Sequence, residues 1–261
     1  MTSRLKFNPG RHTYTLDGKP IPGVTTTIRK STDKPALVGA AARETALWAV
    51  HHYGLVGELG EDKWVAACKA AYRDQWNAAG KRGTLLHEAA RQLVAGDPIT
   101  PVGAEGNQWP DDVIRSAEQL AKFMDEWDAE PLISERPVYH SEHRWAGTLD
   151  LVAKVRDGRV LLLDYKTGSG VYPEASMQLA AYRHATHVQL ESTTGLEDHP
   201  MAKVNGAAVV WVRPDGYDVI PVRSDVVVYQ KFLHMLPVAA WVDWKPSESI
   251  GEPLPTPGVA S

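Results

Sequence analysis

The chain opens with an alternation of polar and apolar residues. Residues 12–28 read HTYTLDGKPIPGVTTTI, and the alternation is centred on Asp17-Gly18. A period of two is typical of strands, and Asp-Gly is a preferred dipeptide of two-residue hairpin turns. The pattern therefore predicts a β-hairpin over 12–28.

Two long helices are predicted next. From Lys34 the Ala-rich stretch KPALVGAAARETALWAVHHYG is typical of a helix, with Gly54 as its C-terminal stop. A second helical stretch runs over about 61–95. Glycine inside a helix costs about 1 kcal/mol relative to alanine, so we expect this second helix to break near Gly80 or Gly83.

The middle of the chain predicts one more helix and then a block of strands. Pro110, followed by two aspartates, opens the helical stretch VIRSAEQLAKFMDEWDAE, and acidic residues are favourable at a helix start. LISERPVYHS, RWAGTLDLVAKVR and RVLLLDYKTG follow, separated by short polar turns such as Asp157-Gly158. Such spacing favours an antiparallel meander.

The C-terminal part predicts a helix, a hairpin and a last helix. PEASMQLAAYRHATHV (173–188) has helical spacing, and a hairpin is expected to turn at Pro214-Asp215-Gly216. A final helix is expected over about 224–241. The tail 245–261 has four prolines and no aromatic residue, so we expect it to be disordered.

These elements predict an α/β fold in which helices flank a mixed central sheet. We expect the sheet strands near 131–165 and 203–222, and helices 34–97 and 110–130 on one side. At 261 residues with 43% apolar residues, the chain suits a single domain with a substantial core.

The organisation expected within that domain is a hairpin and helical extension (1–82) followed by a core (83–244). No run of eighteen apolar residues occurs, and the first residues lack an apolar signal segment. We therefore expect neither a membrane span nor a membrane partner. We expect a cytoplasmic protein. The single cysteine, Cys68, excludes cysteine-clustered zinc or iron–sulfur sites.

Charge is distributed unevenly. The net charge is −4, but residues through Arg82 carry thirteen Lys/Arg against seven Asp/Glu, while the remainder carries fifteen against twenty-five. An acidic total therefore does not exclude a basic, nucleic-acid-binding surface on the N-terminal third. An incidental imbalance across solvated faces is the other interpretation.

Three charged residues interrupt an otherwise apolar pair of strands in 147–168, GTLDLVAKVRDGRVLLLDYKTG. Asp164 and Lys166 are two apart and share one face of their strand, whereas Tyr165 points to the other. Asp150 lies on the preceding strand, which folds back alongside. Two carboxylates that converge beside an ammonium suit Mg²⁺ or Mn²⁺. The alternative is a buried Asp–Lys pair that satisfies itself.

Four motifs in this order resemble those of a known family. GTLD (147–150), DYK (164–166), QLAAY (178–182) and the upstream His87 in RGTLLHEAA resemble the PD-(D/E)XK nuclease superfamily. More specifically, they resemble the RecB-type branch that includes phage recombination exonucleases. The resemblance implies a restriction-endonuclease-like core with a helical N-terminal extension.

The resemblance also implies roles for individual residues. Asp150 and Asp164 would bind the metal, with the backbone carbonyl of Tyr165 as a further ligand. Lys166 would be the catalytic lysine. His87 would be an additional metal ligand or would hold a water; an ordinary, partly buried helix histidine is the alternative.

Three more residues have implied roles. Gln178 and Tyr182 are four apart and share a helix face, which in the family lies at the active site and positions the substrate strand. Core packing for Tyr182 and a solvated Gln178 are the alternative. Glu135, in ISERPVYH, stands where related nucleases carry a catalytic glutamate that positions water or binds a second metal. An edge-strand glutamate more commonly meets only solvent.

The sequence departs from the family in places. Leu149 stands where the name of the family has proline. The iron–sulfur cluster of several relatives is excluded here. No G-x-x-x-x-G-K-[ST] phosphate loop occurs, so no nucleotide cofactor is expected and any helicase would be a separate partner.

The stretch 63–83, KWVAACKAAYRDQWNAAGKRG, is a candidate substrate track. It interleaves Arg73, Lys81 and Arg82 with Tyr72 and other aromatic residues. Basic residues can meet phosphates and aromatic rings can stack on bases. An amphipathic helix with core tryptophans and solvated lysines is the alternative.

The expected function is therefore divalent-metal-dependent cleavage of DNA at linear ends, single- or double-stranded. PGVTTTIRKSTDKPALV (22–38) resembles the opening of phage-encoded members, which suggests a role in phage recombination, repair or replication within the host cytoplasm. A single-strand annealing protein or a helicase would be a partner, and a homo-oligomer is compatible. The rival functions are a structure-specific endonuclease, an inactive DNA-binding module and a metal-free structural protein.

Overall fold

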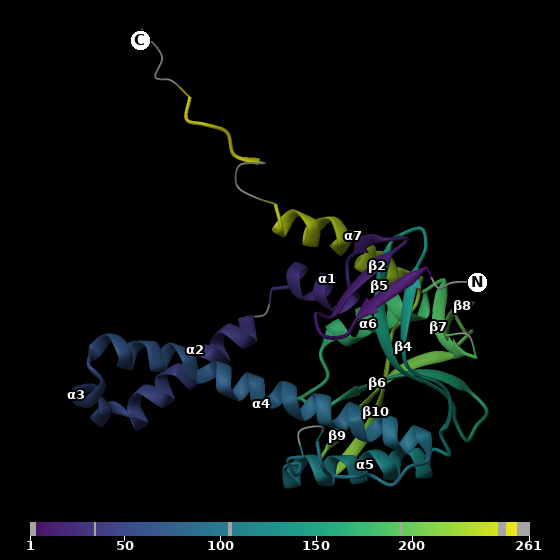
Figure 1. Ribbon diagram of the computed structural model, residues 1–261, viewed down its shortest axis with the longest axis horizontal. Helices are drawn as coiled ribbons and strands as arrows, with labels where there is room; N and C mark the ends of the chain where they lie inside the picture. The colour runs from purple at the N-terminus through teal and green to yellow at the C-terminus, as the bar shows by residue number, and fades with distance from the viewer. Residues whose placement is uncertain (1–3, 34, 104–105, 194, 245–248, 255–261) are drawn as a thin grey trace.

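The sheet and its helices form an α/β body from which a helical arm projects (Figure 1). The computed structural model describes residues 4–33, 35–103, 106–193, 195–244 and 249–254. The helices are α1 (Val24–Ser31), α2 (Pro35–His51), α3 (Val56–Leu59), α4 (Glu61–Ala95), α5 (Asp111–Glu126), α6 (Pro173–Arg183) and α7 (Val226–Val242), with a 3-10 turn at Tyr53–Leu55. Within these described residues, no helix is long and apolar enough to cross a membrane.

A seven-stranded mixed sheet forms the centre, in the order β10-β9-β6-β5-β4-β7-β8. Its strands are β4 (Glu130–His140), β5 (Trp145–Lys154), β6 (Val160–Lys166), β7 (His187–Ser192), β8 (Gly195–Pro200), β9 (Gly206–Arg213) and β10 (Gly216–Val222). β4, β5 and β6 pair antiparallel, which confirms the predicted meander, and β6 pairs parallel with β9. The expected restriction-endonuclease-like fold, a mixed sheet flanked by helices, is confirmed.

Helices cover both faces of this sheet. On one face α1, α6 and α7 pack around a cluster that includes Trp145, Leu179 and Phe232. On the other face the C-terminal half of α4 packs with α5 around Leu86 and Phe123. Apolar residues on both faces explain why β5 and β6 read as nearly continuous hydrophobic runs.

The helical arm consists of α2, α3 and the N-terminal half of α4. It extends away from the sheet (Figure 1), so the prediction that residues 34–97 cover one side is wrong for this half. Trp48 stacks on His52 at 4.3 Å between ring centroids, and the Trp64 indole N–H donates to the His52 carbonyl. The Trp64 hydrogen bond, together with the packing of Trp48 against Trp64 at 6.4 Å between ring centroids, holds the end of α2 against α4.

The predicted break near Gly80 or Gly83 is also wrong, because α4 is continuous over its 35 residues. Packing against α2 at one end and against α5 and the sheet at the other offsets the cost of two glycines. At Gly83, a Cβ atom would lie 3.9 Å from the Thr167 hydroxyl, so the helix passes close to the end of β6.

A separate three-stranded sheet precedes α1, made of β1 (Leu5–Asn8), β2 (Thr13–Leu16) and β3 (Lys19–Ile21). Asp17 and Gly18 both have positive φ, 53° and 73°, as the predicted tight turn requires. The hairpin ends before 28, because Val24, Thr27 and Ile28 form a buried helical face.

Two further predictions need correction. The helix expected over 173–188 ends at Arg183, because His187 and Val188 pair with β4 and extend into β7. β8 pairs with β7 and was missed with it, and β7 was missed because its partner β4 lies about 50 residues earlier in the chain. A strand held by such distant pairing has little local signature.

The remaining elements lie near their expected places. α2 ends at His51, three residues before Gly54, and the 3-10 turn carries the chain through that glycine. α7 begins after Asp225, whose side chain accepts from the amides of Val227 and Val228. In the tail, 245–248 and 255–261 lie outside the described residues, and 249–254 are exposed.

Candidate active site

The candidate site lies where β5 and β6 separate. Their pairing ends at Leu151 opposite Leu163, and Asp150 and Asp164 are the next residues on each strand. Beyond this point β6 continues to pair with β9, as far as Lys166. We call this place the fork. Both aspartates are almost fully buried there, with exposed fractions of 7% and 1%.

Asp150 takes the place of a backbone acceptor at the fork. Its Oδ2 accepts a hydrogen bond from the Tyr165 amide at 2.8 Å. The separated strands leave that amide without a β5 carbonyl, so the carboxylate satisfies it. The Tyr165 side chain points to the opposite face and packs in the cluster with Leu86. The role of its backbone carbonyl as a metal ligand stays a prediction.

Asp164 is held by two side chains. Gln178, on α6, donates its amide to Asp164 Oδ1 at 2.9 Å, and Lys166 Nζ lies 2.5 Å from Asp164 Oδ2. Gln178 thus contacts a carboxylate of the site and is not merely solvated. This contact is consistent with the expectation that its face of α6 lies at the site. The Lys166 side chain keeps 37% of its surface exposed, so its ammonium lies at the edge of the site.

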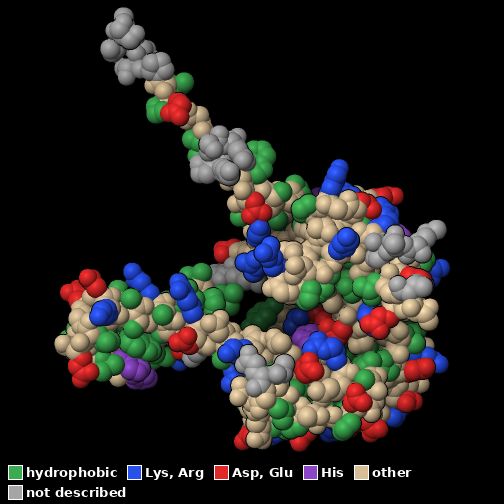
Figure 2. Space-filling view, in the orientation of Figure 1, with side chains coloured by type: hydrophobic (Ala, Val, Ile, Leu, Met, Phe, Trp, Pro, Cys, Tyr) green, Lys and Arg blue, Asp and Glu red, His purple; other side chains and the backbone are tan. Residues whose placement is uncertain are grey.

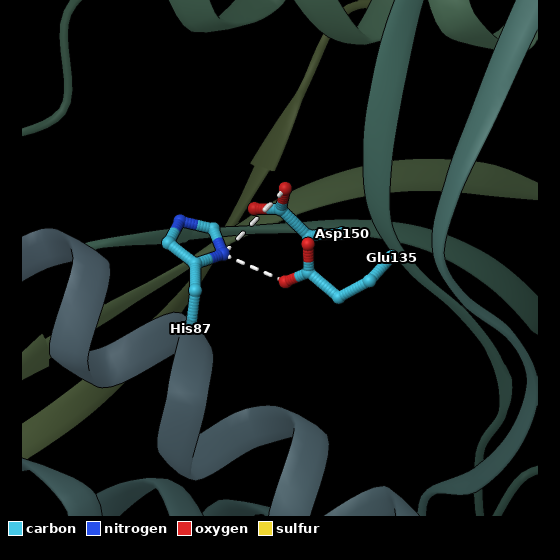
Figure 3. Close-up of side chains that lie close together, drawn as sticks. All are labelled: His87, Glu135 and Asp150. Carbon is cyan, nitrogen blue, oxygen red and sulfur yellow. Dashed lines mark hydrogen bonds and ion pairs between the residues drawn. The ribbon is translucent and has the colours of Figure 1, made fainter. Parts of the chain in front are cut away.

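His87 and Glu135 approach the fork from outside it. His87 projects from α4, and its Nδ1 lies 2.8 Å from Glu135 Oε1 and 3.9 Å from Asp150 Oδ1 (Figure 3). Glu135 has a φ of +49°, which is uncommon for a residue with a side chain. It stands between Ser134 and Arg136, the residues that pair with β5 on either side of Asp150. This conformation directs its carboxylate toward the histidine.

The electrostatics reflect several charges gathered in a buried place. Burial and the neighbouring carboxylate raise the pKa of Asp164 to about 6, and burial raises the pKa of Asp150. Burial alone would lower the pKa of His87, but its hydrogen bond to Glu135 and the nearby aspartates raise it to about 9. The same aspartates raise the pKa of Lys166 against the effect of burial.

These residues fit a hard divalent cation. His87, Glu135 and Asp150 each offer one ligand atom, and the three atoms lie within 4.8 Å of one another. Asp164 lies outside this group, although it adds a second buried carboxylate at the fork. Three carboxylates in one place repel each other, and a cation among them would offset that repulsion.

The glycine of GTLD and the tyrosine of QLAAY lie against each other. A Cβ atom at Gly147 would stand 2.4 Å from the Tyr182 ring, so only glycine allows the ring to lie there. Tyr182 is buried, which raises the pKa of its hydroxyl well above the ordinary value. The two motifs therefore form one packing unit beneath the fork.

The basic residues of the candidate track have different surroundings. Arg82 is paired with Asp112 of α5 at 2.7 Å. Lys81 is exposed on α4, and Arg73 is exposed beside the Tyr72 ring on the arm. Of the aromatic residues, Trp64 packs inside the arm, as the amphipathic alternative expects, whereas Trp76 keeps 40% of its surface exposed.

A pocket of about 230 Å³ adjoins Lys166 and Gln178. It includes residues of α1 and of the loop before α6, notably Arg29 and Tyr172, to which the sequence analysis gave no role. For Arg29 the only signal in the sequence was the resemblance of 22–38 to phage-encoded openings, and Tyr172 had no signal. Figure 2 shows a hollow in this region of the surface, beside the arm, with Lys/Arg, His and Asp/Glu side chains gathered at its wall.

This chain is similar to a known protein family and to solved structures. No curated protein matches the sequence. The crystal structure of SSO0001 is similar, with 12% sequence identity and a TM-score of 0.29, over 51% of this chain and 60% of that chain. The chain thus spans less than two thirds of that protein. The model of the PD-(D/E)XK nuclease superfamily matches residues 63–215, which is more than half of the chain. These residues include the fork, and this protein belongs to the PD-(D/E)XK nuclease superfamily, whose members use divalent metals.

Proposed function

We propose that this protein is a DNA exonuclease of the RecB-type branch, which hydrolyses phosphodiester bonds from linear ends with Mg²⁺ or Mn²⁺. The observation that carries the proposal is the convergence of Asp150, Asp164 and Lys166 at the fork, with His87 and Glu135 facing them. An ion pair that only satisfied itself would not need the additional histidine and glutamate beside it.

The side chains would divide the work as follows. Asp150 and Asp164, with His87 and Glu135, would hold the cation. Bound there, it would lower the pKa of a water and offset charge on the scissile phosphate. Lys166 would donate a hydrogen bond to the attacking water or to a phosphate oxygen, since its ammonium lies at the exposed edge.

Hydrogen bonds from Gln178 and from His87 would also position these groups. Gln178 holds Asp164 Oδ1, which keeps Oδ2 toward Lys166. His87 donates to Glu135 and so fixes the direction of that carboxylate. Groups locked before the substrate arrives need little reorganisation during the reaction.

The test is a gel assay of end-labelled linear DNA and closed circular DNA, with Mg²⁺, Mn²⁺ or EDTA. We expect metal-dependent loss of the linear DNA alone, abolished in Lys166→Ala. Lys154→Ala is the matched control, because Lys154 is exposed at the opposite end of the sheet. It should keep full activity.

The other outcomes separate the rival functions. Nicking of the circle would indicate an endonuclease instead. Binding of DNA without turnover in either metal would indicate an inactive binding module. Full activity in Lys166→Ala would contradict the assignment of the fork. We further propose a role in phage DNA recombination, repair or replication, beside an annealing protein or a helicase.

A further inference from the structure

The pocket beside Lys166 is formed by α1, the loop that follows β6, and the start of α6. Val24, Thr27 and Ile28 bury one face of α1, which leaves Thr25 and Arg29, four residues apart, on the exposed face. The lining is Thr25, Ile28, Arg29, Lys166, Gly170, Tyr172, Glu174, Ala175 and Gln178. The pocket therefore continues directly from the residues that contact Asp164.

The charge of this pocket favours an anion. Arg29 has no ion-pair or hydrogen-bond partner within the described part of the chain. Lys166 adds a second cation, and Glu174 is the one carboxylate in the lining. An unpaired guanidinium at the wall of a pocket is well suited to a phosphate group.

Tyr172 provides an exposed aromatic ring at the same place. It keeps 56% of its surface exposed. Its hydroxyl is 3.0 Å from the Ser169 hydroxyl, and the Trp211 indole donates to the Gly168 carbonyl at 2.8 Å. Two contacts thus fix the loop that carries the ring. A ring held in advance loses little entropy when a base stacks on it.

We propose that this pocket binds the nucleotide next to the scissile phosphate, with Tyr172 stacking on its base and Arg29 pairing with its backbone phosphate. The inference rests on the proposed function, because the nucleotide is placed relative to the bond that the fork cleaves. The apolar side chains of Ile28 and Ala175 complete the wall of the pocket.

The base contact is tested with oligonucleotides that carry one abasic site, moved position by position. Tyr172→Leu is expected to raise KM about 10-fold on the intact substrate, within the range of one lost base stack. When the abasic site is at the position that stacks on Tyr172, the KM of wild type should rise by the same factor. On that substrate Tyr172→Leu should cause no further rise in KM. Tyr172→Phe should behave as wild type, because it keeps the ring.

The phosphate contact is tested in the same way with single uncharged methylphosphonate linkages. Arg29→Gln is expected to raise KM about 5-fold on the intact substrate, and to add nothing when the neutral linkage is at the matching position. Trp241→Leu and Arg159→Gln are the controls, since Trp241 is exposed near the end of α7 and Arg159 lies in the turn before β6.

The outcomes are distinguishable. If wild type shows no metal-dependent cleavage, the proposed function fails and the pocket proposal fails with it. If wild type cleaves but the Tyr172 and Arg29 variants behave like the two controls, only the pocket proposal is overturned. The proposal would also be overturned if the effects of the protein variant and of the modified substrate on KM multiplied at every abasic or neutral position. In that case no single nucleotide or phosphate would be contacted by these residues.

Discussion

The two halves of α4 differ although they belong to one helix. The C-terminal half buries Leu86, Ala89 and Ala90 against the sheet and α5, and it carries His87 to the fork. The N-terminal half contacts mainly α2 and α3, and much of its surface is exposed. A helix fixed on a sheet can hold a ligand atom to within a fraction of an ångström, whereas a two-helix arm can only offer a surface.

From this difference we expect the fork to determine the rate of catalysis and the arm to contribute to substrate affinity. At the fork the buried carboxylates are held by Tyr165, Gln178 and Lys166, so a small change should alter turnover. On the arm the basic residues are exposed and screened by salt, so a change there should alter binding modestly. Four predictions test this contrast.

The largest effect is expected at the fork itself. Asp164→Asn removes one charge without changing shape, so kcat should fall at least about 100-fold while the melting temperature changes by only a few degrees. Asp157→Asn, in the exposed turn at the other end of β6, is the matched control and should keep kcat. A normal kcat in Asp164→Asn would contradict the proposed role.

Metal should stabilise the fork and not the arm. Free Mn²⁺ at 100 times its Kd should raise the free energy of unfolding by about 2.7 kcal/mol, because the folded protein alone gathers the ligands. Hydrogen exchange should slow in β5 and β6 and stay unchanged in α2. The effect should disappear in Asp150→Asn. Equal slowing in α2 would argue that the arm is coupled to the site.

Substitutions in the packing of Gly147 against Tyr182 should also have a clear effect, on stability. Gly147→Ala places a Cβ atom against the Tyr182 ring and should lower the free energy of unfolding by about 1–3 kcal/mol in urea titrations. In the Tyr182→Leu background the same substitution should cost clearly less, because the clash is gone. Additive losses in the double variant would exclude the contact as the cause.

The smallest effect is expected on the arm. Arg73→Gln and Lys81→Gln should each raise KM about 2- to 5-fold at low salt, leave kcat unchanged, and converge with wild type as salt increases. Lys203→Gln, near the start of β9, is the control, because that end of the strand is remote from the fork. A change in kcat of the arm variants would mean that the arm contributes to chemistry.

Local patterns in the sequence predicted much of the fold and of the fork. The Asp17-Gly18 turn, the β4–β6 meander and the position of α6 as far as Arg183 all follow from signals within a few residues. The same holds for the two aspartates and Lys166, because alternation along a strand and one tight turn suffice to bring them together. The contact between Gln178 and Asp164 goes beyond that reasoning, because the place of Gln178 at the site was implied only by the family resemblance.

The sequence by itself therefore determined the β2–β3 hairpin, the strands β4, β5, β6, β9 and β10, most helices, and the approach of the two aspartates and Lys166 to one another. Only the tertiary structure decided the continuity of α4, the strands β7 and β8, the left-handed backbone of Glu135, and the pairing of Arg82 with Asp112. Only it placed Arg29 beside Tyr172. The physical reason is range: turns and alternation are set by neighbouring residues, whereas these features depend on contacts between segments far apart in the chain.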